Sequence, residues 1–202
     1  KLGRGGIWYT PQSGIWQTVW LESVADDYVR DLHIVPDIDS DTVRVTIRAA
    51  SPSVSVSVFD GDTRIAGVDS YTVEIPMADT PCADSHTVEI PMADYECWSP
   101  ENPKLYGLVV STRGDAVRSY FGMRKFSVGS DGRYKRLFLN NKPYFHKGLL
   151  DQGYWPEGLL TPPDDEAVVR ELELVKKMGF NMLRKHIKIE PLRWYYHCDR
   201  LG

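Results

Sequence analysis

The sequence holds few cysteines and none of the spacings that bring them together. Only three occur among 202 residues, Cys82, Cys97 and Cys198, and no CxxC pattern is present. A disulfide framework or a structural zinc site needs paired or clustered ligands. We therefore expect free, partly buried thiols and no bound metal.

Long apolar runs and a strong basic charge are also missing. No apolar stretch approaches the roughly 18 residues that a membrane-spanning helix needs. The sequence has 24 Lys and Arg against 28 Asp and Glu, a net charge of −4, so there is no strong basic field to neutralise phosphates. Neither a membrane nor a nucleic acid is expected as a partner.

The first residues, KLGRGG, contain neither an initiator methionine nor an apolar signal core. We expect the native N-terminus to lie further upstream, so the localisation is unknown, with cytoplasm and periplasm both open. The sequence also lacks a phosphate-binding Gly-rich loop, a GxSxG nucleophile elbow and any metal-ligand spacing. No cofactor is therefore expected.

Strand-like patterns dominate the first two thirds of the sequence. Residues 15–22 alternate with apolar groups on both faces, which predicts a buried strand. A sandwich needs more strands than this segment supplies, so we interpret residues 1–24 as the end of an upstream β-domain.

Residues 25–128 read as an immunoglobulin-like β-sandwich, because short strands are separated by turn signals such as DIDSD, DGD and RGD. The Cys…Trp…Cys pattern of antibody domains is absent, so the likeness is one of architecture only. The candidate strands are residues 30–35, 42–49, 53–59, 72–75, 87–90, 105–111 and 117–128.

An exact repeat interrupts this domain. The octapeptide TVEIPMAD occurs at residues 72–79 and again at 87–94. Two copies are too few for a solenoid, so a local duplication that adds a strand or a loop is the plain interpretation, and a loop that reaches the active site is the alternative. The proline in each copy should end its strand or hold it at an edge.

The last third of the sequence changes to alternating strands and helices. After a charged linker at 129–136, LFLNNKPYF predicts a hairpin that turns at Asn140-Asn141. A strand at 144–149, a helix begun by Thr161 or Asp164 and ended by Gly179, a strand at 180–183 and a second helix from Pro191 follow. The order βαβα predicts the first units of an incomplete (β/α)8 barrel at residues 129–202, since a whole one needs roughly 250 residues. The fold class is thus mainly β, a sandwich followed by a truncated barrel.

Polar side chains follow both predicted barrel strands. In such a barrel the reactive face lies at the carboxyl ends of the strands. Hydrogen-bonding groups and aromatic rings together suit a sugar pocket. The candidate substrate-binding residues are Asp151, Gln152, Trp155, Arg184 and His186.

Several of these residues also have a purely structural interpretation. Arg184 could pair with Asp151 to close the rim, His186 could act only through a neighbour, and Trp155 could pack under the helix. Glu190 is more plausible as a carboxylate at a helix N-terminus than as a catalyst. The aromatic group at 194–196 and Cys198 are expected to pack.

These segments resemble glycoside hydrolase family 2, the group of β-galactosidases, β-glucuronidases and β-mannosidases. TPQSGIWQTVWLE resembles the exit of that family's sugar-binding jelly roll. WSPENPKLYGLVV and YFGMRKFSV resemble the closing strands of its sandwich, and LFLNNKPYFHKGLLDQGYWPEG and GFNMLRKHIKIEPLRWYYHCDRLG resemble the start of its barrel. The coverage is essentially the whole chain.

The resemblance implies retaining, exo-acting hydrolysis of a β-linked sugar by two glutamates about 5 Å apart. Those glutamates lie on later barrel strands, and no Asn-Glu dipeptide occurs here, so no catalytic residue is expected in this chain. Better-known members carry Arg-x-x-His after the second strand, where Ile187 takes the histidine's place. They often carry Asn-Arg-His after the first, where this sequence has Asp151-Gln152. The galactosidase, glucuronidase and mannosidase assignments therefore all stay open.

Two other classes of function remain possible from the sequence. One is a non-catalytic β-sandwich that binds carbohydrate or protein, although it offers few exposed aromatics beyond Tyr28, Phe59, Tyr71 and Tyr95. The other is a small intact enzyme that acts as a homo-oligomer.

Overall fold

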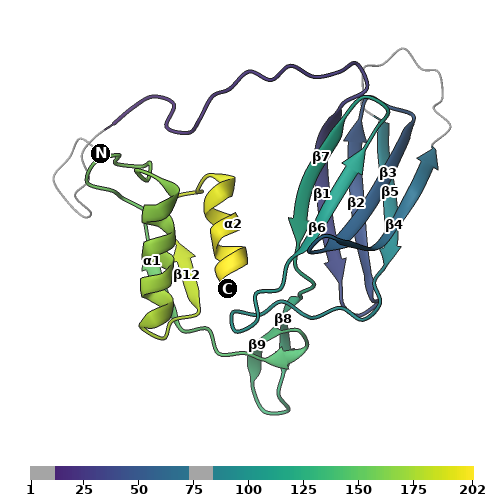
Figure 1. The fold of residues 1–202 in the computed structure, drawn as a ribbon. Coiled ribbons are helices and arrows are strands. Elements are labelled where there is room, and N and C mark those ends of the chain that lie inside the picture. The colour runs from purple at the N-terminus through teal and green to yellow at the C-terminus, as the bar shows by residue number, and fades with distance from the viewer. Residues whose placement is uncertain (1–11, 73–83) are drawn as a thin grey trace. The chain divides into compact units, whose positions relative to one another are not determined.

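A computed structural model describes residues 12–72 and 84–202. The chain forms two compact units, which we describe separately. One comprises Glu22–Phe145, and the other comprises His146–Leu201 together with the N-terminal segment that ends at Leu21. Figure 1 shows that the first unit is almost entirely β and that both long helices lie in the second.

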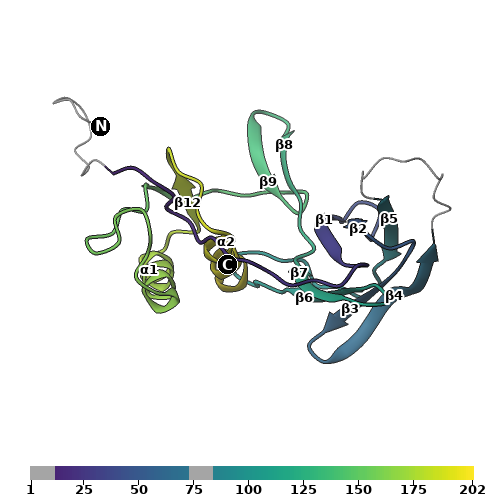
Figure 2. The ribbon, with the colours of Figure 1, turned by 90° about the horizontal axis from the view of Figure 1, so that it is seen from above.

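The larger unit is built on two antiparallel sheets that face each other (Figure 2). The first has the order β1-β2-β5 and the second the order β4-β3-β6-β7. The strands of the first sheet are β1 (Val29–Asp37), β2 (Thr42–Ala49) and β5 (Asp84–Pro91). Those of the second are β3 (Ser53–Asp60), β4 (Thr63–Thr72), β6 (Tyr106–Ser111) and β7 (Ala116–Phe121). The mainly β class predicted from the sequence is confirmed.

Alternating side chains of these strands fill the space between the sheets. A strand that buries one face sends every second residue to the core. Val43, Val45 and Ile47 of β2 are fully buried, as are Val56 and Val58 of β3 across from them. They belong to one contiguous apolar cluster to which β5, β6 and β7 also contribute. Burial of this cluster stabilises the unit by about 25 cal/mol for each Å² of apolar surface removed from water.

The strand predictions for this unit were correct in five places and wrong in two. β4 was missed, because its edge position leaves most of its side chains exposed and removes the alternation. The predicted continuous strand at 117–128 is broken, since β7 ends at Phe121 and the fully buried Met123 pairs with Cys97 instead. The predicted strand at 72–75 and the first copy of the repeat lie, from residue 73 on, outside the described residues. In the second copy Pro91 ends β5, as predicted.

A small three-stranded sheet follows the sandwich, with the order β10-β9-β8. Its strands are β8 (Phe126–Ser130), β9 (Lys135–Leu139) and β10 (Lys142–Pro143). The predicted hairpin turn is confirmed, with positive φ values of 51° at Asn140 and 63° at Asn141. The predicted linker at 129–136 is wrong, because its ends pair as strands and leave only a short turn around Asp131.

The second unit is a strand–helix–strand–helix arrangement. β11 (Gly148–Asp151) and β12 (Met182–Lys185) are parallel neighbours, joined by α1 (Asp165–Lys177) and followed by α2 (Leu192–Leu201). The Asp164 side chain caps α1 by accepting the N–H of Ala167 at 2.6 Å. Both strands lie two to four residues later than predicted: their parallel pairing begins at Gly148 and Met182.

The core of this unit lies between the two helices and the strands. Val168 and Leu172 of α1 and Trp194 of α2 are buried together. Leu174 and Met178, at the C-terminal end of α1, are more than half exposed. The strand predicted at residues 15–22 is also wrong: no strand forms there, and Trp20 and Leu21 are exposed. A strand needs a neighbour for its backbone hydrogen bonds, and none of the described strands pairs with this segment.

Candidate functional site

The carboxyl ends of β11 and β12 lie side by side. In the parallel register Leu150 pairs with Arg184 and Asp151 with Lys185. The backbone N–H of His186 donates to the Asp151 carbonyl at 2.9 Å and extends this pairing by one residue. The two segments that the sequence singled out therefore leave the sheet at the same edge. We call this edge, residues 151–155 and 184–190, the rim.

Asp151 turns toward Lys185 and not toward Arg184. Its Oδ2 lies 2.5 Å from Lys185 Nζ, and its Oδ1 accepts the N–H of Gly153 at 2.7 Å. The alternative in which Arg184 pairs with Asp151 is therefore wrong. Successive side chains of a strand point to opposite faces, so Arg184 and Lys185 cannot both face Asp151. Arg184 is exposed.

Two lysines and two carboxylates of the rim form a buried network. Lys185 Nζ also lies 2.7 Å from Glu190 Oε1, and Lys188 Nζ lies 3.0 Å from the same oxygen. The side chains of Asp151, Lys185, Lys188 and Glu190 are 13%, 9%, 4% and 1% exposed. We call these four residues the ion network. Its formal charges cancel, which allows it to lie out of water.

The ion network keeps Lys185 charged. Burial opposes the charge on Lys185, but hydrogen bonds to Asp151 and Glu190 outweigh it, so the pKa of Lys185 is raised above its ordinary value. The Trp194 ring adds a cation–π contact, with Nζ 4.4 Å from its centroid. Glu190 stands directly before α2, as predicted, but its carboxylate binds lysines and not the helix N-terminus.

Gln152 and His186 meet at the rim. Gln152 Nε2 lies 2.9 Å from His186 Nδ1, and both side chains are half-buried. Since an amide nitrogen only donates, this contact is a hydrogen bond in the tautomer that carries the ring proton on Nε2. The structure thus brings together two of the residues predicted to bind substrate.

Trp155 lies on the side of the rim that faces the helices. It packs against Val168, Leu172 and Trp194, and its backbone exchanges hydrogen bonds of 2.7 and 3.0 Å with Leu159. Of the aromatic group expected to pack, Trp194 is buried, whereas Tyr196 is 40% exposed.

The N-terminal segment brings a second tryptophan to this edge. The Trp16 carbonyl accepts from Thr161 Oγ1 at 3.0 Å, and Lys188 Nζ lies 5.4 Å from the Trp16 ring centroid. Gln17 Nε2 donates to the Ile189 carbonyl at 3.3 Å. Trp16 was not predicted as a site residue, because it is 145 residues from Thr161 in sequence and only the fold brings them together.

Sequence reasoning also missed Lys185, Lys188 and Glu171. Lys185 could have been found from strand alternation, which places its side chain on the face of β12 opposite to that of Arg184. Glu171 lies on α1 with a buried Oε2 that has no hydrogen-bond partner. Burial and then the neighbouring Asp151 raise the pKa of the Glu171 carboxyl. Helical spacing could have found Glu171, because it lies three residues after Val168 on the buried face of α1, whereas Glu173 lies on the exposed face.

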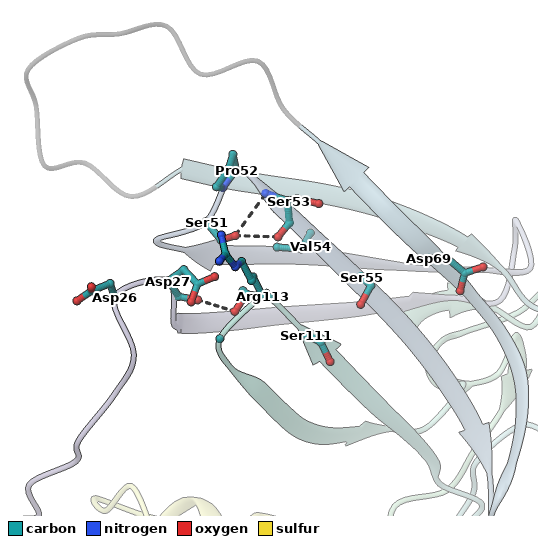
Figure 3. Close-up of a pocket in the computed structure, with 12 residues that line it drawn as sticks. Asp26, Asp27, Ser51, Pro52, Ser53, Val54, Ser55, Asp69, Ser111 and Arg113 are labelled. Atoms are coloured by element: carbon teal, nitrogen blue, oxygen red, sulfur yellow. Dashed lines mark hydrogen bonds between the residues drawn. The ribbon is translucent and has the colours of Figure 1, made fainter.

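The sandwich carries a separate pocket of about 720 Å³. Figure 3 shows hydroxyl and charged side chains around it, including Ser53, Asp27 and Arg113. The Ser51 hydroxyl donates to the Ser53 carbonyl at 2.9 Å and fixes one wall. None of the described lining residues is aromatic. The pocket therefore offers hydrogen bonds but no ring on which a sugar could stack.

Metal and membrane features are also absent from the described parts of the chain. Residues 12–72 and 84–202 hold no group of three His, Cys, Asp or Glu side chains that could bind a metal. In the same residues, neither helix is long and apolar enough to cross a bilayer.

Comparison with known proteins connects both units to one group of enzymes. Residues 27–124 match the family model described as glycosyl hydrolases family 2. A β-galactosidase of Photobacterium profundum is 29% identical over 206 residues, which cover 94% of this chain and 19% of that protein. A β-galactosidase of Lactococcus lactis is 25% identical over 204 residues, which cover 94% and 18%. The chain thus spans about a fifth of the length of these curated relatives.

Solved structures share the fold at lower identity. A family 2 β-galacturonidase from Eisenbergiella tayi, bound to galacturonate, superposes with a TM-score of 0.68 at 23% identity, covering 89% of this chain and 32% of that one. A β-glucuronidase from Faecalibacterium prausnitzii superposes with a TM-score of 0.69 at 23% identity, and the match covers 88% of this chain and 27% of that one.

Proposed function

Because these matches place the chain in glycosyl hydrolases family 2, we propose that it is a middle portion of a retaining, exo-acting β-glycoside hydrolase and forms one rim of its sugar pocket. The observation that carries the proposal is the parallel β11–β12 pair, whose carboxyl ends gather Asp151, Gln152, Arg184 and His186. Active sites of parallel barrels are built at this end of the strands.

The domain organisation belongs to the same proposal. Residues 1–24 correspond to the end of a sugar-binding jelly roll, residues 25–128 to the sandwich and residues 129–202 to the start of a (β/α)8 barrel. The order β11-α1-β12-α2 supports the last assignment, since two βα units in series are what such a barrel repeats. The remaining units would close the barrel and complete the pocket.

The proposed chemistry needs two carboxyl groups about 5 Å apart, one as acid/base and one as nucleophile. Neither buried glutamate of the second unit suits these roles. Glu190 is bound by two lysines, and Glu171 lies on the outer helix α1. We therefore propose that this chain contains no catalytic residue and is inactive alone.

The five predicted substrate-binding residues of the rim would contact or orient the sugar. Gln152 and His186 offer hydrogen bonds to hydroxyls, and Arg184 supplies an exposed cation. Asp151 and Trp155 would hold these side chains in place from the buried side. The ligand would be a β-linked sugar, and the curated relatives, named β-galactosidases, favour a galactoside.

Two measurements test this proposal. The purified chain should release no chromophore from nitrophenyl β-galactoside, β-glucuronide or β-mannoside, since the catalytic pair is missing. The reading frame that follows Gly202 should encode further βα units with glutamates at two strand ends. Hydrolysis by the purified chain, or a reading frame without such units, would overturn the proposal.

A sugar-binding sandwich is the second candidate, and the pocket of Figure 3 favours it. Its serine hydroxyls and Arg113 suit a hydroxylated ligand, but the aromatic platform that sugars prefer is missing from its described lining. Binding of a glycan that is lost on Arg113→Ala and unaffected by Gln152→Ala would support this candidate over the rim.

A further inference from the structure

Gly153 is held from both sides by charged groups. Its N–H donates to Asp151 Oδ1 at 2.7 Å, and its carbonyl accepts from Lys188 Nζ at 2.6 Å. A Cβ at this position would lie 2.2 Å from Glu190 Oε1 and 2.8 Å from each of the two lysine nitrogens, Nζ of Lys185 and of Lys188. With φ at +57°, only glycine takes this conformation without strain. The ion network therefore leaves no room for a side chain at this residue.

Gly153 directly follows Gln152, and Lys185 directly precedes His186. The same four side chains thus fix the backbone next to both members of the Gln152–His186 pair. The Asp151 carbonyl adds a third restraint by accepting the N–H of His186. The members of the ion network bind each other and the backbone, and their side chains are buried.

Stability alone does not explain four buried charges here. Desolvation of an ion pair can cost more than the pairing returns, and apolar replacements of similar volume are often neutral or stabilising. The better-attested use of such groups is to select one arrangement among several. A loop that must present an amide and an imidazole in fixed positions needs that selection.

We infer that Asp151, Lys185, Lys188 and Glu190 are positioning residues that lock Gly153 and so aim Gln152 and His186 at the sugar. The inference rests on the proposed function of the rim. It also changes the role of Asp151, which acts through the loop and not by contact with substrate.

The wild-type chain provides a first test that needs no variant. Hydrogen exchange should protect the Gly153 amide strongly, and the exposed Gly158 amide should exchange fast. Long-range ¹H–¹⁵N spectra should show His186 as a single tautomer with the proton on Nε2. Equal exchange at the two glycines, or a mixture of tautomers, would overturn the inference.

Variants then separate positioning from folding. Lys188→Met should shift the Gln152 side-chain amide signals and mix the His186 tautomers, while the signals of α1 and α2 stay in place. Lys188→Arg, which keeps the charge and the donors, should restore the wild-type spectra. Lys177→Met, on the exposed part of α1, is the matched control and should change neither signal. Unchanged Gln152 and His186 signals in Lys188→Met would contradict the inference.

Titration with methyl β-galactopyranoside distinguishes this inference from the proposed function. Wild type should bind, and Lys188→Met should bind about tenfold more weakly, as expected when one well-aimed hydrogen bond is lost. If wild type does not bind while Lys188→Met still disturbs the pair, the rim is not the sugar site, but the ion network still positions Gln152 and His186. Equal affinity in both proteins would overturn the positioning role.

Discussion

At the scale of single residues, the rim depends on which side of β12 each side chain takes. Lys185 enters the ion network and Arg184 stays exposed, because neighbours in a strand point to opposite faces. The chain then reverses at Ile187, whose φ of +57° is unusual for a β-branched residue. This reversal precedes Lys188, whose amine reaches back to the Gly153 carbonyl. The strained Ile187 thus lies between the two lysines of the ion network.

Replacement of Ile187 by glycine should stabilise the chain. A non-glycine residue in the left-handed region lowers the free energy of unfolding by about 1–3 kcal/mol. Glycine removes this strain, but its greater freedom in the unfolded chain lowers the free energy of unfolding by about 0.4–1 kcal/mol. Ile187 is 64% exposed, so little apolar burial is lost. Urea unfolding of Ile187→Gly should therefore show a gain of about 1 kcal/mol.

The matched control is Ile189→Gly. Ile189 is also largely exposed but has no positive φ, so the same substitution should destabilise by about 0.5–1 kcal/mol. Equal effects of the two substitutions would show that Ile187 carries no strain.

The Cys198 thiol should be almost inert. Burial, with Asp199 nearby, raises the pKa of this thiol from 9.0 to about 12. A pKa raised by about three units lowers the thiolate fraction at pH 8 about a thousandfold, and the thiolate is the reactive form. In a Cys82→Ser, Cys97→Ser background, labelling by iodoacetamide should be slow, should rise with pH up to about 12, and should become fast in urea. Fast labelling of the native protein at pH 8 would contradict this.

At the scale of elements, helix α1 carries a buried carboxyl whose charged form is disfavoured. Burial raises the pKa of Glu171, so the unfolded chain releases its proton at lower pH than the native chain. Native stability therefore falls as pH rises through the unfolded and then the native pKa. Glu171→Gln should raise the urea midpoint at pH 8 and have little effect near pH 4. Glu173→Gln, exposed on the same helix, should show no such pH dependence.

The β9–β10 hairpin gives a second prediction at this scale. Both turn residues have positive φ, but Asn140 makes two part-buried bonds to other segments: its side chain donates to the Trp98 carbonyl at 2.9 Å and accepts the Lys125 N–H at 3.0 Å. Asn140→Gly should cost about 1–3 kcal/mol, because these part-buried bonds are lost. Asn141→Gly keeps the turn and loses one exposed hydrogen bond to Asp39. It should change the free energy of unfolding by less than about 0.5 kcal/mol. Similar urea midpoints for both variants would refute this account.

The elements also show how far sequence reasoning reaches. β2 and the ends of α1 were predicted closely, because alternation and an Asp cap are local signals. β4 was missed, because an edge strand with exposed faces has no such signal. The ion network could not be derived, because the contact of Lys188 with Gly153 depends on a turn at Ile187 that no sequence rule places there.

At the scale of the whole chain, the two units should be separable. The sandwich buries its own continuous apolar cluster, and the hydrogen bonds between its strands stay within residues 22–145. Residues 22–145 expressed alone should give a cooperative urea transition and the far-UV circular dichroism of an antiparallel sheet. A non-cooperative transition would show that the sandwich needs the second unit to fold.

The central claim is that the ends of β11 and β12, and not the sandwich pocket, form the sugar-binding site of this chain. The most direct test is a titration of the ¹⁵N-labelled 202-residue chain with methyl β-galactopyranoside, followed by ¹H–¹⁵N spectra. We predict saturable shifts at Gln152, Gly153, Arg184 and His186, and none at Ser53 or Arg113. Shifts confined to Ser53 and Arg113, or no saturable shift at the rim, would contradict the account.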